Sequence, residues 1–151
     1  MTMTMIRAWL RMGLFLASIV YCAACGPSLY SEAHVERTNQ WLSNFQNYPA
    51  KQVLEGKVTY YSDSLAGHTT ANGEIYDPNM LTAANRTLPF GTIVRVARHQ
   101  DGRSVIVRIN DRGPFGDKNR ILDLSRAAAE RLGMLRAGVV PVRVEVLWQE
   151  Q

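Results

Sequence analysis

Two β-branched segments joined by Asp101-Gly102 constrain the fold of this chain more than any other feature. Residues 92–98 and 103–109 are both rich in Val and Ile, which favour strands. Asp-Gly between two such runs is the strongest short-range signal of a β-hairpin. We therefore expect an antiparallel hairpin here, and the rest of the fold must accommodate it.

The remainder of the segment from Gly56 onward also indicates short strands and turns. Three further runs have the composition of short strands: residues 58–62, 81–84 and 142–147. A helix is predicted over residues 126–132, because Ser125 is a preferred N-cap residue and Gly133 suits the left-handed position after a helix. Short strands with one or two short helices in about 95 residues predict a mainly β fold, a small closed barrel without exposed strand edges.

The first 25 residues match an export signal. Two arginines precede an apolar stretch of 13 residues, 12–24, which is shorter than the roughly 20 residues that a membrane-spanning helix needs. Small residues then stand directly before Cys25, as in a bacterial lipobox, although Cys22 occupies the place of the usual Leu. We predict a signal peptide over residues 1–24 and lipidation of Cys25. The alternative is an ordinary signal peptide that leaves Cys25 as a free thiol.

Residues 25–55 are polar and carry no strand pattern, so we interpret them as a lipid-anchored tether. Ser31 is a candidate cap of a short helix, and Trp41, Phe45 and Tyr48 then recur at the spacing of one helix face. These aromatic side chains either pack on the barrel or form a sugar-stacking surface.

Charge and cysteine usage exclude several classes of protein. The chain has 17 Lys and Arg against 13 Asp and Glu, a net charge of +4, and the basic residues are scattered. Nucleic-acid-binding proteins cluster theirs, so no nucleic acid is expected as a partner. Both cysteines, Cys22 and Cys25, precede the predicted barrel, which excludes a disulfide scaffold or a cysteine zinc site inside it. Three dispersed histidines also argue against a metal site.

Four phrases of the sequence, in their order and spacing, resemble the rare lipoprotein A (RlpA) family. They are Thr70-Ala-Asn-Gly-Glu74 with Tyr76, Leu81-Thr-Ala-Ala84 with Leu88-Pro-Phe-Gly91, Arg108-Ile-Asn-Asp-Arg-Gly-Pro114, and Ile121-Leu-Asp-Leu-Ser125 with residues 127–129. The resemblance implies a six-stranded double-psi β-barrel over residues 56–148 and a lytic transglycosylase that needs no cofactor. Many members carry a C-terminal SPOR module, and we expect no SPOR domain here because the chain ends at Gln151.

The resemblance assigns two carboxylates to the active site. Asp111 matches the family's Asn-Asp-Arg-Gly-Pro motif and is the candidate general acid and base; on the residues alone, an Asx-turn is the alternative. Glu74 is the candidate assistant, either through repulsion that favours protonated Asp111 or by stabilising a cationic transition state. Its alternative is a solvated loop Glu. An acid–base pair is the minimum set of groups that breaks a glycosidic bond, and these two carboxylates would provide it.

One position departs from the family pattern. The family phrase Leu-Thr-Ala-Ala-His ends here in Asn85, and the resemblance places that His in the active site. Asn holds a hydrogen bond but cannot carry a proton at neutral pH. Asn85 is a catalytic-site candidate with two opposite consequences. It suffices if the position only orients a carboxyl group or a sugar, and activity falls if the position transfers a proton. His68 could substitute only by folding back across the groove, and His34 and His99 are not candidates.

Four more side chains are candidate substrate contacts: Thr70, Asn72, Tyr76 and Arg112. The first three could hydrogen-bond to sugar hydroxyls or fix their own loop. Arg112, like Arg108 and Arg120, could meet the anionic muramyl lactate or peptide carboxylates. For Arg112 we favour the alternative, a structural role that braces the Asp111 loop.

We predict an endolytic transglycosylase that cleaves links between N-acetylmuramic acid (MurNAc) and N-acetylglucosamine (GlcNAc) and leaves 1,6-anhydro-MurNAc ends. The alternatives are a non-catalytic, expansin-like glycan-binding lipoprotein, which Asn85 favours, and a hydrolase that activates water. The predicted partners are peptidoglycan glycan strands, the membrane through the lipid anchor, and cell-division or envelope proteins. Gly26 replaces the Asp associated with inner-membrane retention, so the predicted location is the outer membrane, facing the periplasm.

Overall fold

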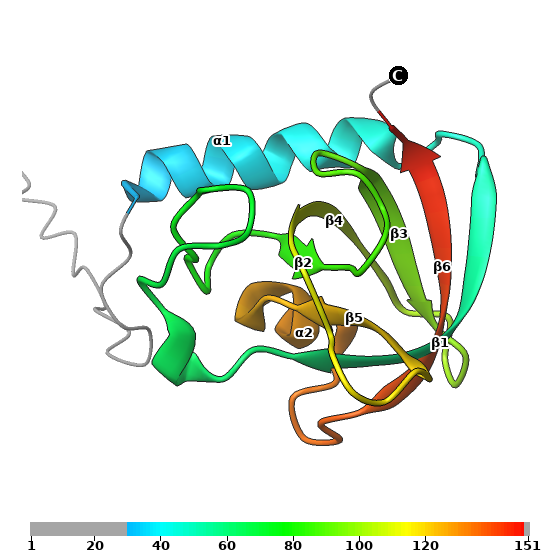
Figure 1. Ribbon diagram of the computed structural model, residues 1–151. Coiled ribbons are helices and arrows are strands. Elements are labelled where there is room, and N and C mark those ends of the chain that lie inside the picture. Colours follow the sequence, from blue (N-terminus) through cyan, green and yellow to red (C-terminus); the bar gives the residue numbers. More distant parts are fainter. Residues whose placement is uncertain (1–29, 150–151) are drawn as a thin grey trace, which may run out of the picture.

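The computed structural model describes residues 30–149, which form a barrel with a long helix across one side (Figure 1). Its elements in chain order are α1 (Glu32–Leu42), η1 (Ser43–Phe45), β1 (Gln52–Tyr60), η2 (Asp63–Leu65), β2 (Thr82–Ala84), β3 (Ile93–Arg98), β4 (Ser104–Asp111), β5 (Arg120–Leu124), α2 (Arg126–Leu132) and β6 (Val140–Trp148). The predicted signal peptide and Cys25 lie outside the described residues. Between residues 30 and 149, no helix is long and apolar enough to span a bilayer.

Six strands close into a barrel in the order β1-β5-β2-β4-β3-β6. The barrel closes between β1 and β6, which pair antiparallel from Gln52 opposite Val146 to Val58 opposite Val140. The β1–β5 and β2–β4 pairs are parallel, and the other pairs are antiparallel. This confirms the predicted closed barrel of six strands with two α-helices.

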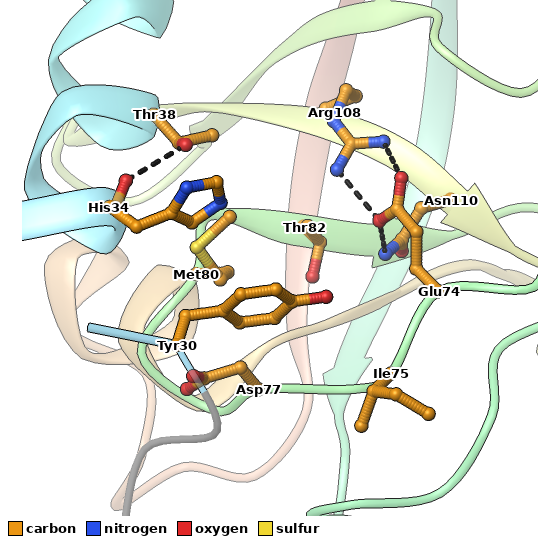
Figure 2. A pocket seen from close by; sticks show the side chains of 10 residues that line it. All are labelled: Tyr30, His34, Thr38, Glu74, Ile75, Asp77, Met80, Thr82, Arg108 and Asn110. Atoms are coloured by element: carbon orange, nitrogen blue, oxygen red, sulfur yellow. Dashed lines mark hydrogen bonds and ion pairs between the residues drawn. The ribbon is translucent and has the colours of Figure 1, made fainter. Parts of the chain in front are cut away.

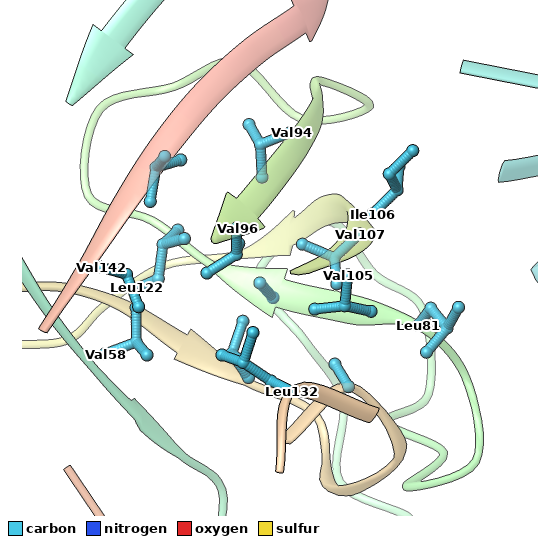
Figure 3. Close-up of a cluster of buried hydrophobic side chains, with 14 of the residues drawn as sticks. Val58, Leu81, Val94, Val96, Val105, Ile106, Val107, Leu122, Leu132 and Val142 are labelled. Atoms are coloured by element: carbon cyan, nitrogen blue, oxygen red, sulfur yellow. The ribbon is translucent and has the colours of Figure 1, made fainter. Parts of the chain in front are cut away.

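The predicted hairpin is present as β3 and β4. Val94 lies opposite Val107 and Val96 opposite Val105, and Gly102 in the turn has φ 69°, which glycine adopts without strain. The valine side chains point into the barrel and form its core with neighbours from the other strands (Figure 3). Full burial of one such side chain stabilises the fold by about 1.5–3 kcal/mol.

Strand β4 is buried on both faces, so packing fixes the position of its C-terminal end. Val107 and Ile109 belong to the barrel core. Ile106 points to the other face, where it lines a small cavity with Leu42 of α1 and Arg131 next to the end of α2. The two helices therefore cover the outside of the strand that leads into Asn110 and Asp111.

Helix α2 has the predicted bounds. The Ser125 hydroxyl accepts a hydrogen bond from the Ala128 N–H, and Gly133 ends the helix with φ 73°. Both caps satisfy backbone groups that a helix end leaves unpaired.

The segment predicted as a tether contains a helix that belongs to the domain. As predicted, Ser31 caps α1 by accepting a hydrogen bond from the His34 N–H. Asn39 is buried and fixes the helix to the barrel, donating to the Asn79 carbonyl and accepting from the Leu81 N–H, both at 3.0 Å. Leu42 is buried in the same contact.

The three aromatic residues do not share one helix face. The helix ends at Leu42, and of the three only Phe45 is buried, with its ring 6.5 Å from that of Trp148. Trp41 and Tyr48 contact the Phe45 ring and stay 45% exposed each.

Strand β1 also departs from the prediction. It begins at Gln52, within the segment assigned to the tether, and ends at Tyr60 instead of residue 62. Its first half is rich in polar residues, yet every residue from Gln52 to Val58 pairs with β6. Pairing with a strand almost 90 residues away in sequence outweighs the weak local propensity (on the order of 1 kcal/mol).

Candidate active site

Asp111 ends β4 and collects hydrogen bonds from three segments. Its Oδ1 accepts from the backbone N–H groups of Ala71 and Arg112, both at 2.8 Å, and its Oδ2 accepts from the Tyr61 hydroxyl at 2.6 Å. The alternative for Asp111, an Asx-turn, is not formed, since the carboxylate accepts from Tyr61, Ala71 and Arg112 rather than from the backbone N–H two residues on. The side chain is thus oriented by its surroundings and lies in the wall of a cavity of about 170 Å³.

Tyr61, which directly follows β1, is a site residue that the sequence did not indicate. Burial, followed by the hydrogen bond to Asp111, raises the pKa of the Tyr61 hydroxyl far above its usual value of 10. Tyr61 therefore stays protonated and donates to Asp111. Its ring centroid is 4.8 Å from that of Tyr76, which lines the same cavity.

The turn over residues 70–73 is docked against the end of β4. The Thr70 hydroxyl donates to Asn72 Oδ1 at 2.7 Å, and Asn72 Oδ1 also accepts from the Glu74 N–H at 3.1 Å. The Asn72 N–H donates to the Asn110 carbonyl. Thr70 and Asn72, both predicted substrate contacts, thus hold their own turn together, and that turn presents the Ala71 N–H to Asp111.

Glu74 forms a bidentate ion pair. Its carboxylate accepts hydrogen bonds from both terminal nitrogens of Arg108 at 2.8 Å and from Asn110 Nδ2 at 2.9 Å. Partial burial alone would raise the pKa of Glu74, but the hydrogen bonds from Arg108 and Asn110 outweigh it and lower the pKa to about 2. Glu74 is therefore an anion at physiological pH.

The two candidate carboxylates face different cavities. Asn110 and Asp111 are consecutive in β4, so their side chains point to opposite sides of the strand. Asn110 binds Glu74 at a cavity of about 390 Å³ (Figure 2), whereas Asp111 lines the smaller cavity beside Tyr61. Within residues 30–149 the Glu74 carboxylate bonds to Arg108 and Asn110 and not to Asp111, so the two carboxylates are held by separate sets of donors.

Asn85 is buried and bonded to backbone. Its Oδ1 accepts from the N–H groups of Thr87 and Leu88 at 2.9 and 2.7 Å, and its Nδ2 donates to the Ile121 carbonyl at 2.9 Å. Its backbone N–H donates to the Asp111 carbonyl. The amide therefore shapes the turn after β2 and does not reach either carboxylate.

Two arginines hold the loop that follows Asp111. Arg112 stacks over the Phe90 ring at 3.7 Å and donates to the Asn85 carbonyl. Arg86 donates to the carbonyls of Pro114, Asp117 and Lys118 at 2.9 to 3.4 Å. Arg86 carried no signal in the sequence, because its partners are backbone atoms of a distant loop.

Two of the three histidines line the cavities, and the third, His99, lies elsewhere as expected. His68 lines the cavity of Asp111, without folding across a groove. His34, which was not a candidate on the sequence, lines the larger cavity with Glu74. His99 pairs with Glu55 at 2.9 Å, away from both cavities.

Comparison with known proteins gives matches in both sequence and fold. The sequence profile of a family described as lytic transglycolase matches residues 53–144. The chain is 50% identical over 92 residues to the endolytic peptidoglycan transglycosylase RlpA of Vibrio cholerae, covering 61% of this chain and 35% of that one. It is 41% identical over 129 residues to the protein of the same name from Pasteurella multocida, covering 81% and 44%. The chain therefore spans less than half the length of these relatives.

Two solved structures are similar in fold. One is a Streptomyces papain inhibitor, 29% identical with a TM-score of 0.53, which covers 68% of this chain and 100% of the inhibitor. The other is an expansin from Clavibacter michiganensis, 20% identical with a TM-score of 0.52, which covers 66% of this chain and 52% of the expansin. The expansin similarity shows a shared fold alone.

Proposed function

This chain belongs to the lytic transglycolase family, and from that premise we propose that it cleaves MurNAc–GlcNAc links within peptidoglycan strands and leaves 1,6-anhydro-MurNAc ends. The names of the Vibrio and Pasteurella relatives support this substrate and reaction class. The observation that carries the proposal is Asp111, a half-buried carboxylate in a cavity wall with both oxygens held by donors.

Asp111 serves first as acid and then as base. Protonated Asp111 gives its proton to the glycosidic oxygen as the bond to the anomeric carbon breaks, and GlcNAc leaves with that proton. The muramyl 6-hydroxyl attacks the anomeric carbon, and its proton passes to the Asp111 carboxylate, which regenerates the acid. One carboxyl group can take both roles in turn, and no water is consumed.

Tyr61 keeps the reacting oxygen of Asp111 oriented through this cycle. Oδ1 is occupied by two backbone N–H groups, so Oδ2 is the oxygen that exchanges the proton. A phenol hydroxyl both donates and accepts hydrogen bonds, so Tyr61 can donate to the carboxylate and accept from the protonated acid. Its raised pKa prevents it from becoming the base itself.

Glu74 assists as a fixed anion rather than as an acid. With a pKa near 2 it has no proton to give at the pH of a cell. Its ion pair with Arg108 orients the turn that presents the Ala71 N–H to Asp111, and its oxygens border the larger cavity. Tyr76 and His68 line the Asp111 cavity and are in place to contact the sugar there.

The reaction places the protein in the bacterial cell envelope, where peptidoglycan is found. The finer location rests on sequence: the export signal over residues 1–24 and lipid attachment at Cys25 support an outer-membrane anchor. We propose cell-division or other envelope proteins as partners, because the chain would act on peptidoglycan in the cell envelope.

Product analysis tests the function. Purified sacculi, intact and stripped of peptides, are incubated with the protein, and the released fragments are analysed by mass spectrometry. We expect 1,6-anhydro-MurNAc ends. Reducing ends would instead identify a hydrolase, and absence of cleavage with retained sacculus binding would identify a non-enzymatic glycan-binding protein.

A further inference from the structure

Helix α1 lies outside the segment that defines the family, yet it contributes side chains to a cavity at the barrel. The family profile begins at residue 53, after α1 has ended. The two hydrogen bonds of buried Asn39 and the burial of Leu42 fix the position of the helix on the barrel. Its N-terminal half is thereby held in one register opposite the 74–80 segment.

This docking encloses the cavity of about 390 Å³ (Figure 2). Tyr30, His34 and Thr38 lie on one side, with Glu74 and Arg108 on the barrel side. The Tyr30 ring extends into the space between the two walls, and the His34 ring stacks on it with centroids 4.9 Å apart. The cavity thus combines the rings of Tyr30, which lies just before α1, and of His34 on α1 with carboxylates and hydroxyls.

We propose that this cavity is a sugar subsite for one uncharged N-acetylated hexosamine unit of the glycan strand, with α1 as a specificity-determining wall. The inference rests on the proposed function and deepens it. It makes Tyr30, His34 and Thr38 part of substrate recognition, although they precede the family's barrel.

Size and charge point to a neutral sugar. Ligand pockets range from roughly 300 to 1,000 Å³, so this one suits a single ring rather than a long fragment. The cation in its barrel wall, Arg108, is already neutralised by Glu74 at 2.8 Å. Arg108 is therefore not available to pair with an anionic muramyl lactate, whereas sugar hydroxyls can donate to the Glu74 carboxylate.

The test measures binding of N-acetylchitotetraose, an uncharged GlcNAc tetramer, by isothermal titration calorimetry. We expect Tyr30→Ala to raise the dissociation constant about fivefold by removing the aromatic face. Thr38→Phe should abolish binding by filling the cavity. Gln40→Ala, an exposed change on the same helix, is the matched control and should bind like the wild type. Unchanged thermal midpoints verify that each variant is folded.

The outcomes separate this inference from the proposed function. Cleavage of sacculi by the wild type with unchanged tetramer affinity in both variants, or no tetramer binding by the wild type, overturns the subsite and leaves the transglycosylase standing. Selective loss of binding in the two variants supports the subsite, even if the wild type releases no anhydro ends and the transglycosylase proposal fails.

Discussion

At the scale of single residues, the Tyr61 hydroxyl is the contact that most directly controls Asp111 Oδ2. Tyr61→Phe removes the 2.6 Å hydrogen bond and little else, so we expect kcat on peptide-free glycan strands to fall about tenfold with KM nearly unchanged. Tyr60→Phe is the matched control, because the adjacent Tyr60 hydroxyl bonds to the Leu135 carbonyl instead. Equal losses in the two variants would refute an orienting role for Tyr61.

The ion pair of Glu74 predicts a pH dependence of stability. A carboxylate whose pKa falls from 4.5 to about 2 on folding stabilises the folded state above pH 4.5, and this contribution is lost as the pH falls toward 2. The free energy of unfolding should therefore decline over that interval, and Glu74→Gln should reduce the decline. Denaturant titrations at pH 2.5, 3.5 and 5 measure the free energy of unfolding of both proteins. The same decline with falling pH in the wild type and in Glu74→Gln would contradict a lowered pKa of Glu74.

Substitution of Asn85 tests whether a side chain at this position transfers a proton. Its amide is occupied by backbone groups, so Asn85→His should leave kcat close to the wild-type value instead of raising it by the ~10²–10⁴-fold typical of general acid–base catalysis. Asn85→Ala should lower the free energy of unfolding by about 1–3 kcal/mol, because buried N–H groups lose their acceptor. A gain in kcat of a hundredfold or more for Asn85→His would show that the position carries a proton.

At the scale of elements, Arg86 couples the turn after β2 to the loop after Asp111. Its guanidinium bonds to carbonyls of Pro114, Asp117 and Lys118, so Arg86→Ala should free this loop. We expect kcat to fall about tenfold, because small displacements of catalytic groups from their reactive positions lower the reaction rate. Arg136→Ala, at an exposed position, is the control. Arg86→Ala with a full kcat would place the loop outside the reaction.

Local sequence signals predicted some elements well and others poorly. The hairpin and α2 were predictable because their determinants, Asp101-Gly102 and the caps Ser125 and Gly133, lie within or beside the element. The start of β1 and the docking of α1 were not. Gln52 becomes strand only through β6, and Asn39 becomes buried only because its amide meets backbone groups near residue 80.

At the scale of the whole molecule, barrel closure assembles the site from distant segments. The resemblance to a family located Asp111 and Glu74 in the sequence. It did not indicate that they face different cavities, which follows from the alternation of Asn110 and Asp111 along β4. Tyr61 was missed for a related reason: its role depends on the end of β1 lying beside the end of β4, 50 residues away.

The central claim is that Asp111 carries the proton in glycan cleavage. Asp111→Asn retains an oxygen that can accept from Ala71 and Arg112, so the fold and the thermal midpoint should persist. The decisive measurement is the rate at which this variant releases 1,6-anhydro-MurNAc ends from peptide-free glycan strands, compared with the wild type. The account predicts no detectable release from the folded variant. Release at the wild-type rate would contradict it.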